Sequence, residues 1–167
     1  MRPTAIRTLD PQASPSVSVV GDTYRVLASG AQTGGAYAII DMLVPPQGGP
    51  GPHAHAEIQE AFYVVAGEVV VRSETQAYTA RAGAFVDIPR GGAVHSFKNE
   101  SDAVAHLLCV VVPAGLDKFF EEIGQPVAAG TFLPPAAPSP AELERLQAVA
   151  QQYGQELFPP DYLDHRP

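Results

Sequence analysis

The sequence predicts an all-β fold, an antiparallel barrel or sandwich with two short helices in its C-terminal third. Short runs rich in Val, Ile, Tyr and Phe alternate with clusters of Gly, Pro, Asp and Asn, which is typical of strands joined by turns. The 167 residues include 15 glycines and 17 prolines, so turns are frequent. No helical period separates the apolar runs, and this disfavours a parallel βαβ sheet.

About nine strands are expected, and they follow one another closely. In the third, the two-residue alternation places Ile40 and Met42 on the interior face and leaves Asp41 facing water. The expected strands cover residues 17–20, 23–27, 36–44, 61–66, 68–72, 76–80, 84–88, 94–98 and 104–112.

Two amphipathic helices are expected after the last of these strands. The first covers residues 116–123, where four apolar residues fall on one face and Gly124 ends the helix. The second begins after Ser139, which forms a capping box with Glu142, and ends near Tyr153. We therefore expect a single domain, in which residues 1–133 form the barrel with its N-terminal strands and the first helix. Residues 134–167 add a proline-rich connector, the second helix and a tail packed on the same domain.

Composition excludes several classes of function. A net charge of −8 repels nucleic-acid phosphates and anionic lipid headgroups, so neither nucleic acid nor a membrane is an expected partner. The longest apolar run, residues 104–112, is far shorter than the ~20 residues that span a bilayer. No secretory signal is recognisable, and a cytoplasmic location is expected. The single cysteine, Cys109, lies in an apolar run and is expected to be a small buried hydrophobe.

Three histidines and a glutamate form a candidate metal site. His53 and His55 are two residues apart, so an extended strand directs both imidazoles to one face. Glu60 follows five residues later, and His95 lies in a separate expected strand. Glu57 competes with Glu60, because it continues the two-residue alternation from His55. Three imidazoles and one carboxylate suit one divalent transition metal, and Fe, Mn, Ni, Cu, Co and Zn all remain possible.

The surroundings of this site are expected to be apolar. Ile40 and Met42 face the interior, Phe62 is in phase with Glu60, and Phe97 is in phase with His95. These four side chains would form the wall of a substrate pocket, and such a pocket suits a small aromatic or planar organic molecule.

The spacing of these residues resembles that of the cupin superfamily. The first motif has four residues between His55 and Glu60 and six between Glu60 and Gly67. The second departs from the family by one extra residue before His95, so either Gly92 replaces Gly91 or a bulge absorbs the extra residue. It consists of Gly83, Pro89-Arg90-Gly91, His95 and Asn99. Beyond both motifs, nearly the whole chain is similar to bacterial single-domain cupins of the quercetin 2,3-dioxygenase-like group.

This resemblance implies a jelly-roll or double-stranded β-helix barrel and a metal-dependent dioxygenase with a flavonol-like or other small aromatic substrate. His53, His55, Glu60 and His95 would bind the metal, and Glu60 would also be the catalytic base. The alternatives are an isomerase, lyase or hydrolase that uses the same site, and a non-catalytic cupin that binds a small molecule. Dioxygen is an expected co-substrate. A symmetric homodimer is also expected, since unpaired strand edges need cover.

Overall fold

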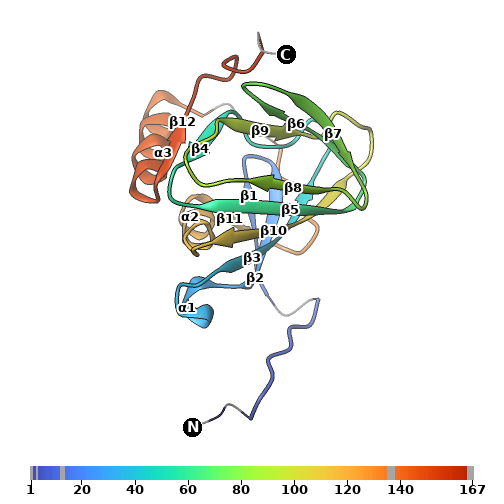
Figure 1. Ribbon diagram of the computed structural model, residues 1–167, viewed down its shortest axis with the longest axis vertical. Helices are drawn as coiled ribbons and strands as arrows, with labels where there is room; N and C mark the ends of the chain where they lie inside the picture. The colour runs from blue at the N-terminus through green and yellow to red at the C-terminus, as the bar shows by residue number, and fades with distance from the viewer. Residues whose placement is uncertain (1, 3, 12–13, 135–137, 165–167) are drawn as a thin grey trace.

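The computed structural model describes residues 2, 4–11, 14–134 and 138–164, and its strands form two facing antiparallel sheets (Figure 1). The seven-stranded sheet has the order β11-β1-β2-β3-β10-β5-β8, and the five-stranded sheet has the order β12-β4-β9-β6-β7. The strands of the seven-stranded sheet are β1 (Ser16–Val19), β2 (Asp22–Ala28), β3 (Ala38–Val44), β5 (Gln59–Ala66), β8 (Phe85–Ile88), β10 (Ala105–Val112) and β11 (Gln125–Val127). The strands of the five-stranded sheet are β4 (His53–His55), β6 (Glu68–Ser73), β7 (Ala77–Arg81), β9 (His95–Lys98) and β12 (Gln155–Leu157). The predicted antiparallel all-β architecture is confirmed.

The helices lie at one end of the sheets. Both predicted helices are present, α2 (Leu116–Ile123) and α3 (Pro140–Gln152), and the capping box of Ser139 and Glu142 begins α3. Phe119 of α2 packs on Val149 and Ala150 of α3. One turn of helix, α1 (Gly30–Thr33), and the short strands β11 and β12 were not expected. Among the described residues, no helix is long and apolar enough to cross a membrane.

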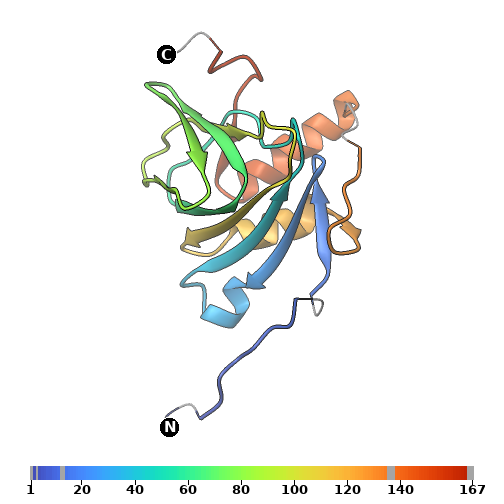
Figure 2. The same ribbon diagram turned by 90° about the vertical axis from the view of Figure 1, so that its right-hand side faces the viewer.

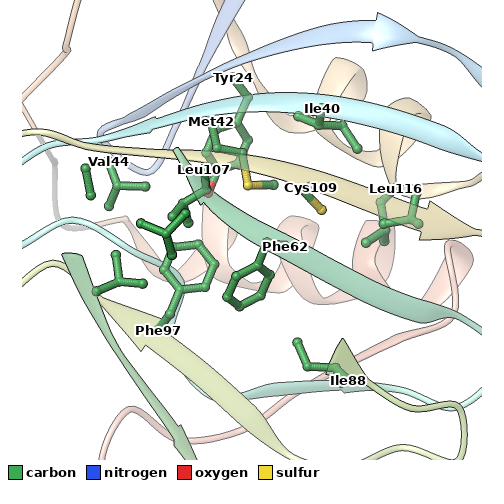
Figure 3. Packing of buried hydrophobic residues seen from close by; sticks show 14 of the residues in the cluster. Tyr24, Ile40, Met42, Val44, Phe62, Ile88, Phe97, Leu107, Cys109 and Leu116 are labelled. Atoms are coloured by element: carbon green, nitrogen blue, oxygen red, sulfur yellow. The ribbon is translucent and has the colours of Figure 1, made fainter. Parts of the chain in front are cut away.

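The main core fills the space between the two sheets (Figure 3). β3 and β10 alternate strictly, and their inward side chains are fully buried while their outward ones are partly exposed. Phe62 and Phe97 meet edge to face, with ring centroids 5.3 Å apart, and Ile40 and Met42 pack in the same cluster. The predicted inward face of the third strand is therefore confirmed.

The C-terminal segment covers the outer side of β4. β12 pairs with β4, and Leu163 packs against Ala54 and Val94. By contrast, the described part of the N-terminal segment extends away from the sheets (Figure 2). Residues 135–137 of the predicted connector and 165–167 of the predicted tail lie outside the described residues.

A buried carboxyl group fixes the loop between β3 and β4. Asp22 is 2% exposed and accepts hydrogen bonds from the Tyr24 hydroxyl, at 2.9 Å, and from the Gly49 amide, at 3.1 Å. Gly49 has a φ of 120°, and a Cβ added there would lie 2.1 Å from the carbonyl oxygen of Phe97. Only glycine fits this contact between the loop and β9.

Stability should fall as pH rises because Asp22 must ionise inside the protein. Burial raises the pKa of Asp22 from 3.8 to about 7, and the hydrogen bonds from Tyr24 and Gly49 only partly oppose this. The folded state therefore holds a proton that the unfolded chain releases between about pH 4 and pH 7. The contribution of protonated Asp22 to the free energy of unfolding is about 4 kcal/mol. It is fully present below about pH 4 and is lost as the pH rises through about 7.

We expect the Asp22→Asn variant to lack this dependence. Urea unfolding at pH 4.5 and pH 8 measures the difference in free energy of unfolding between variant and wild type, so that other titrating groups cancel. The variant should gain stability relative to wild type as pH rises. Parallel pH profiles for the two proteins would contradict the assignment.

Candidate metal centre

The four predicted ligands converge from both sheets. β4 supplies His53 and His55, β9 supplies His95, and β5 of the opposite sheet supplies Glu60. His53 lies directly opposite His95 in the β4–β9 pair. All four side chains are buried, and one ligand atom from each lies within 4.8 Å of the others. The site is thus an interior cluster between the sheets.

The loop before β9 accommodates the extra residue of the second motif. Gly91 and Gly92 both have positive φ, 113° and 80°, a conformation that L side chains rarely adopt. The Gly91 amide donates a hydrogen bond to the carbonyl oxygen of Ala56, which anchors this loop beside β4. Two consecutive glycines absorb the insertion, and His95 still reaches the cluster.

Each imidazole is oriented by a backbone carbonyl group. The Nδ1 atoms of His53, His55 and His95 lie 2.9, 3.0 and 2.9 Å from the carbonyl oxygens of Gly51, Ile58 and Ala93. A carbonyl oxygen only accepts, so each Nδ1 carries the hydrogen. When such a ring is neutral, its Nε2 atom carries a lone pair that faces the cluster, which is the arrangement a metal-binding histidine needs.

The carboxylate of Glu60 faces two of these nitrogens. Its Oε2 atom lies 3.2 Å from Nε2 of His55 and 3.3 Å from Nε2 of His95. Burial by itself would raise the pKa of Glu60, but the hydrogen bonds and positive charge of the imidazoles outweigh it and hold the pKa well below its usual value. Glu60 is therefore an ionised carboxylate that is only 4% exposed.

The surroundings shift the pKa values of His53 and His55 in opposite directions. Burial, with a smaller effect from the charge of His95, lowers the pKa of His53 to about 4, so this ring is neutral at pH 7. Burial also lowers the pKa of His55, but its hydrogen bond to Glu60 and the charge of Glu60 outweigh burial, and the pKa is raised. A neutral His53 retains the free lone pair that metal binding requires.

A divalent metal ion fits these donors. The lone pairs of Nε2 and Oε2 repel one another unless a cation lies between them, either a proton or a metal ion. Neighbouring ligands of one ion, each about 2.1 Å from it, are separated by about 3.0 to 3.4 Å. The observed separations of 3.2 and 3.3 Å lie in this range, so the cluster is compatible with a single divalent metal ion.

The other candidate residues lie elsewhere. Glu57 is exposed and does not belong to the cluster. The predicted pocket residues Ile40, Met42, Phe62 and Phe97 lie in the buried core, and their role in substrate binding stays a prediction. Two cavities, of 510 and 240 Å³, are lined by other residues, the first on the outer side of β4 beside α3.

Two residues near the cluster were not predicted to take part in it. The Cys109 thiol donates a hydrogen bond to Oε1 of Glu60 at 3.2 Å. Gln155 of β12 lies directly opposite His55, so the two side chains leave the sheet on the same face. Its buried Nε2 has no hydrogen-bond partner within the described part of the chain. Strand alternation could have indicated that Cys109 points inward. No local signal predicts β12.

Comparison with known proteins agrees with this architecture. The cupin domain family matches residues 40–111. Quercetin 2,3-dioxygenase of Bacillus subtilis (strain 168) is 24% identical over 123 residues, which are 74% of this chain and 35% of that protein. The chain thus matches about a third of the length of its curated relative.

Solved structures show the same fold. A cupin-superfamily sugar phosphate isomerase from Silicibacter pomeroyi DSS-3 superposes with a TM-score of 0.58 at 21% identity, over 65% of this chain and 77% of the other. KdgF from a Halomonas species gives a TM-score of 0.59 at 15% identity, over 69% and 99%. A predicted oxalate decarboxylase from Thermotoga maritima gives 0.51 at 23% identity, over 60% and 92%.

Removal of one imidazole should abolish tight metal binding. We expect His95→Ala to weaken Co²⁺ affinity by more than the roughly 10- to 100-fold that loss of an outer-shell partner costs. His106→Ala is the matched control, because His106 is also paired with a carboxylate, that of Asp41, but lies outside the cluster. Elemental analysis and Co²⁺ titration measure both variants. Equal affinity in the two would exclude His95 as a ligand.

Proposed function

The chain belongs to the cupin superfamily, and on this premise we propose that it is a metal-dependent dioxygenase acting on a small aromatic or flavonol-like substrate. The observation that carries the proposal is the buried cluster of three Nε2 atoms and one ionised carboxylate between the sheets. Its chemistry matches what a hydroxyl-bearing substrate needs: a cation to bind the oxygen and a base to accept its proton.

A bound divalent metal would supply Lewis acidity and a template for the substrate oxygen. His53, His55 and His95 would hold it, each kept in one tautomer by its carbonyl partner. Glu60 has two roles in this proposal: it binds the metal through Oε2, and it accepts the proton of the substrate hydroxyl. The pKa of Glu60 is held low by the imidazoles, so it becomes a base only when those contacts weaken on substrate binding.

The interior beside the cluster supports the choice of an aromatic substrate. Phe62 lies two residues after Glu60 on β5 and contacts Phe97, which lies two residues after His95 on β9. We propose that these rings, with Ile40 and Met42, contact the apolar part of the substrate and exclude water from the reacting atoms.

Oxygen uptake by metal-loaded protein with a panel of flavonols and catechols tests the proposal. Glu60→Gln keeps the shape of the side chain and an oxygen ligand but removes the base. We expect this variant to retain much of its metal and to lose about 10²- to 10⁴-fold in turnover. Glu57→Gln, an exposed neighbour, should behave as wild type. Full turnover in Glu60→Gln would contradict the role of base. A panel without oxygen uptake would favour an isomerase, lyase or hydrolase, or a small-molecule-binding cupin.

We propose that the protein is a symmetric homodimer that pairs through the edge of the seven-stranded sheet. β8 is the last strand of this sheet, and its Phe85 is 67% exposed directly opposite exposed Tyr63 of β5. Among the described residues, no strand pairs with the outer edge of β8. An apolar pair beside such an edge is a favourable surface for a second copy.

Sedimentation should therefore show a dimer at micromolar concentration. Phe85→Lys places a charge on the edge strand, which opposes pairing, and should shift the protein toward monomer. Tyr78→Lys, an exposed aromatic residue of β7 in the other sheet, is the control and should remain dimeric. A monomeric wild-type protein would exclude the dimer.

A further inference from the structure

Cys109 contacts Glu60 within the core of the seven-stranded sheet. Cys109 lies in β10, where it pairs with Ile40 on one side and Phe62 on the other, and its side chain points into the core with theirs (Figure 3). Glu60 pairs with Val111, so Cys109 and Glu60 are diagonal neighbours on the same face of the sheet. The Sγ atom lies 3.2 Å from Oε1 of Glu60.

The two carboxylate oxygens have different partners. Oε2 faces the Nε2 atoms of His55 and His95, and Oε1 receives the thiol hydrogen of Cys109. A carboxylate only accepts hydrogen bonds, so the thiol is the donor. Among the described residues, the group of candidate metal ligands is His53, His55, Glu60 and His95, and Cys109 does not belong to it.

We propose that Cys109 is a positioning residue, which holds Glu60 so that only Oε2 is offered to the metal. The inference rests on the proposed metal site but not on the reaction that it performs. Oε1, engaged by the thiol, would not be free to turn inward beside Oε2 when a metal ion is bound. The contact would thus leave one more coordination position available for substrate.

The contact also fixes the rotation of the carboxylate. The Glu60 side chain has three rotatable bonds, and without a partner for Oε1 its plane can turn within the site. Outer-shell hydrogen bonds orient ligands in this way, and their loss typically weakens metal binding by about 10- to 100-fold. An apolar residue at position 109 would fill the core equally well but leave Oε1 without its donor.

Matched variants separate the hydrogen bond from packing. Cys109→Ser keeps a donor and Cys109→Ala removes it, while Cys109→Val removes it but leaves no cavity. Leu107→Val is the control, because Leu107 is an equally buried residue of β10 that pairs with Val64, away from Glu60. Circular dichroism and urea unfolding establish that each variant is folded.

Co²⁺ titration of metal-free protein, followed by visible absorption, provides two measurements: the dissociation constant and the shape of the cobalt spectrum. We expect the Cys109→Ala and Cys109→Val variants to bind Co²⁺ about 10- to 100-fold more weakly than wild type. Their visible bands should also be weaker, because a second carboxylate oxygen raises the coordination number. The Cys109→Ser and Leu107→Val variants should have the dissociation constant and the cobalt spectrum of wild type.

The outcomes distinguish this inference from the proposed function. If Ala and Val bind Co²⁺ with the affinity and spectrum of wild type, Cys109 is only a core residue and the inference is wrong. If Leu107→Val changes the spectrum as much as Ala does, the effect is one of packing, and the inference is again wrong. Absence of Co²⁺ binding in the wild-type protein would instead refute the metal site itself.

Discussion

The interior of this protein contains an ionised carboxylate, and the surrounding structure must compensate that charge. Glu60 lies between two sheets beside an apolar core, where an isolated carboxylate would be costly. Its compensation comes from imidazole groups on the opposite sheet, and their free Nε2 atoms offer positive charge only through a proton or a metal ion. The cluster is therefore most stable when it holds a cation, and cation binding is linked to the stability of the whole fold.

The two motifs also form one structural unit around this site. Asn99, at the end of the second motif, is fully buried, and its side-chain amide donates hydrogen bonds to the carbonyl oxygens of Val44 and Ala103. Its backbone pairs with Gln47 and Gly48, in the loop that leads to His53. Because Gly49 packs against the backbone of Phe97, the same loop is fixed to β9. The approach to β4 is thus determined by the strand that carries His95.

Local sequence patterns predicted the parts of the fold that have a regular alternation of apolar and polar residues or a helix-capping motif. The alternation of Ile40 and Met42 indicated the inward face of β3, and Ser139 with Glu142 indicated the start of α3. The short strands β11 and β12 were missed because three residues, such as Gln155–Leu157, are too few to show a period and form only through pairing with distant strands. The ligand types and spacing were readable in sequence, whereas the contact of Cys109 with Glu60 depends on the register of β10 against β5, which no local signal encodes.

The metal site therefore depends on two groups of residues. The histidines and Glu60 provide the donor atoms, and residues outside the motifs determine how those atoms are presented. β12 covers the outer edge of β4, and Gln155 adds a buried Nε2 atom, without a hydrogen-bond partner among the described residues, on the face that His55 shares. β10 supplies the thiol that engages Oε1 of Glu60. On the inference drawn from Cys109, a protein with the same four donors but without a hydrogen-bond donor at this place in β10 would offer a different number of open positions. Because the reaction at a metal depends on those open positions, the ligand set alone does not determine the chemistry of the site.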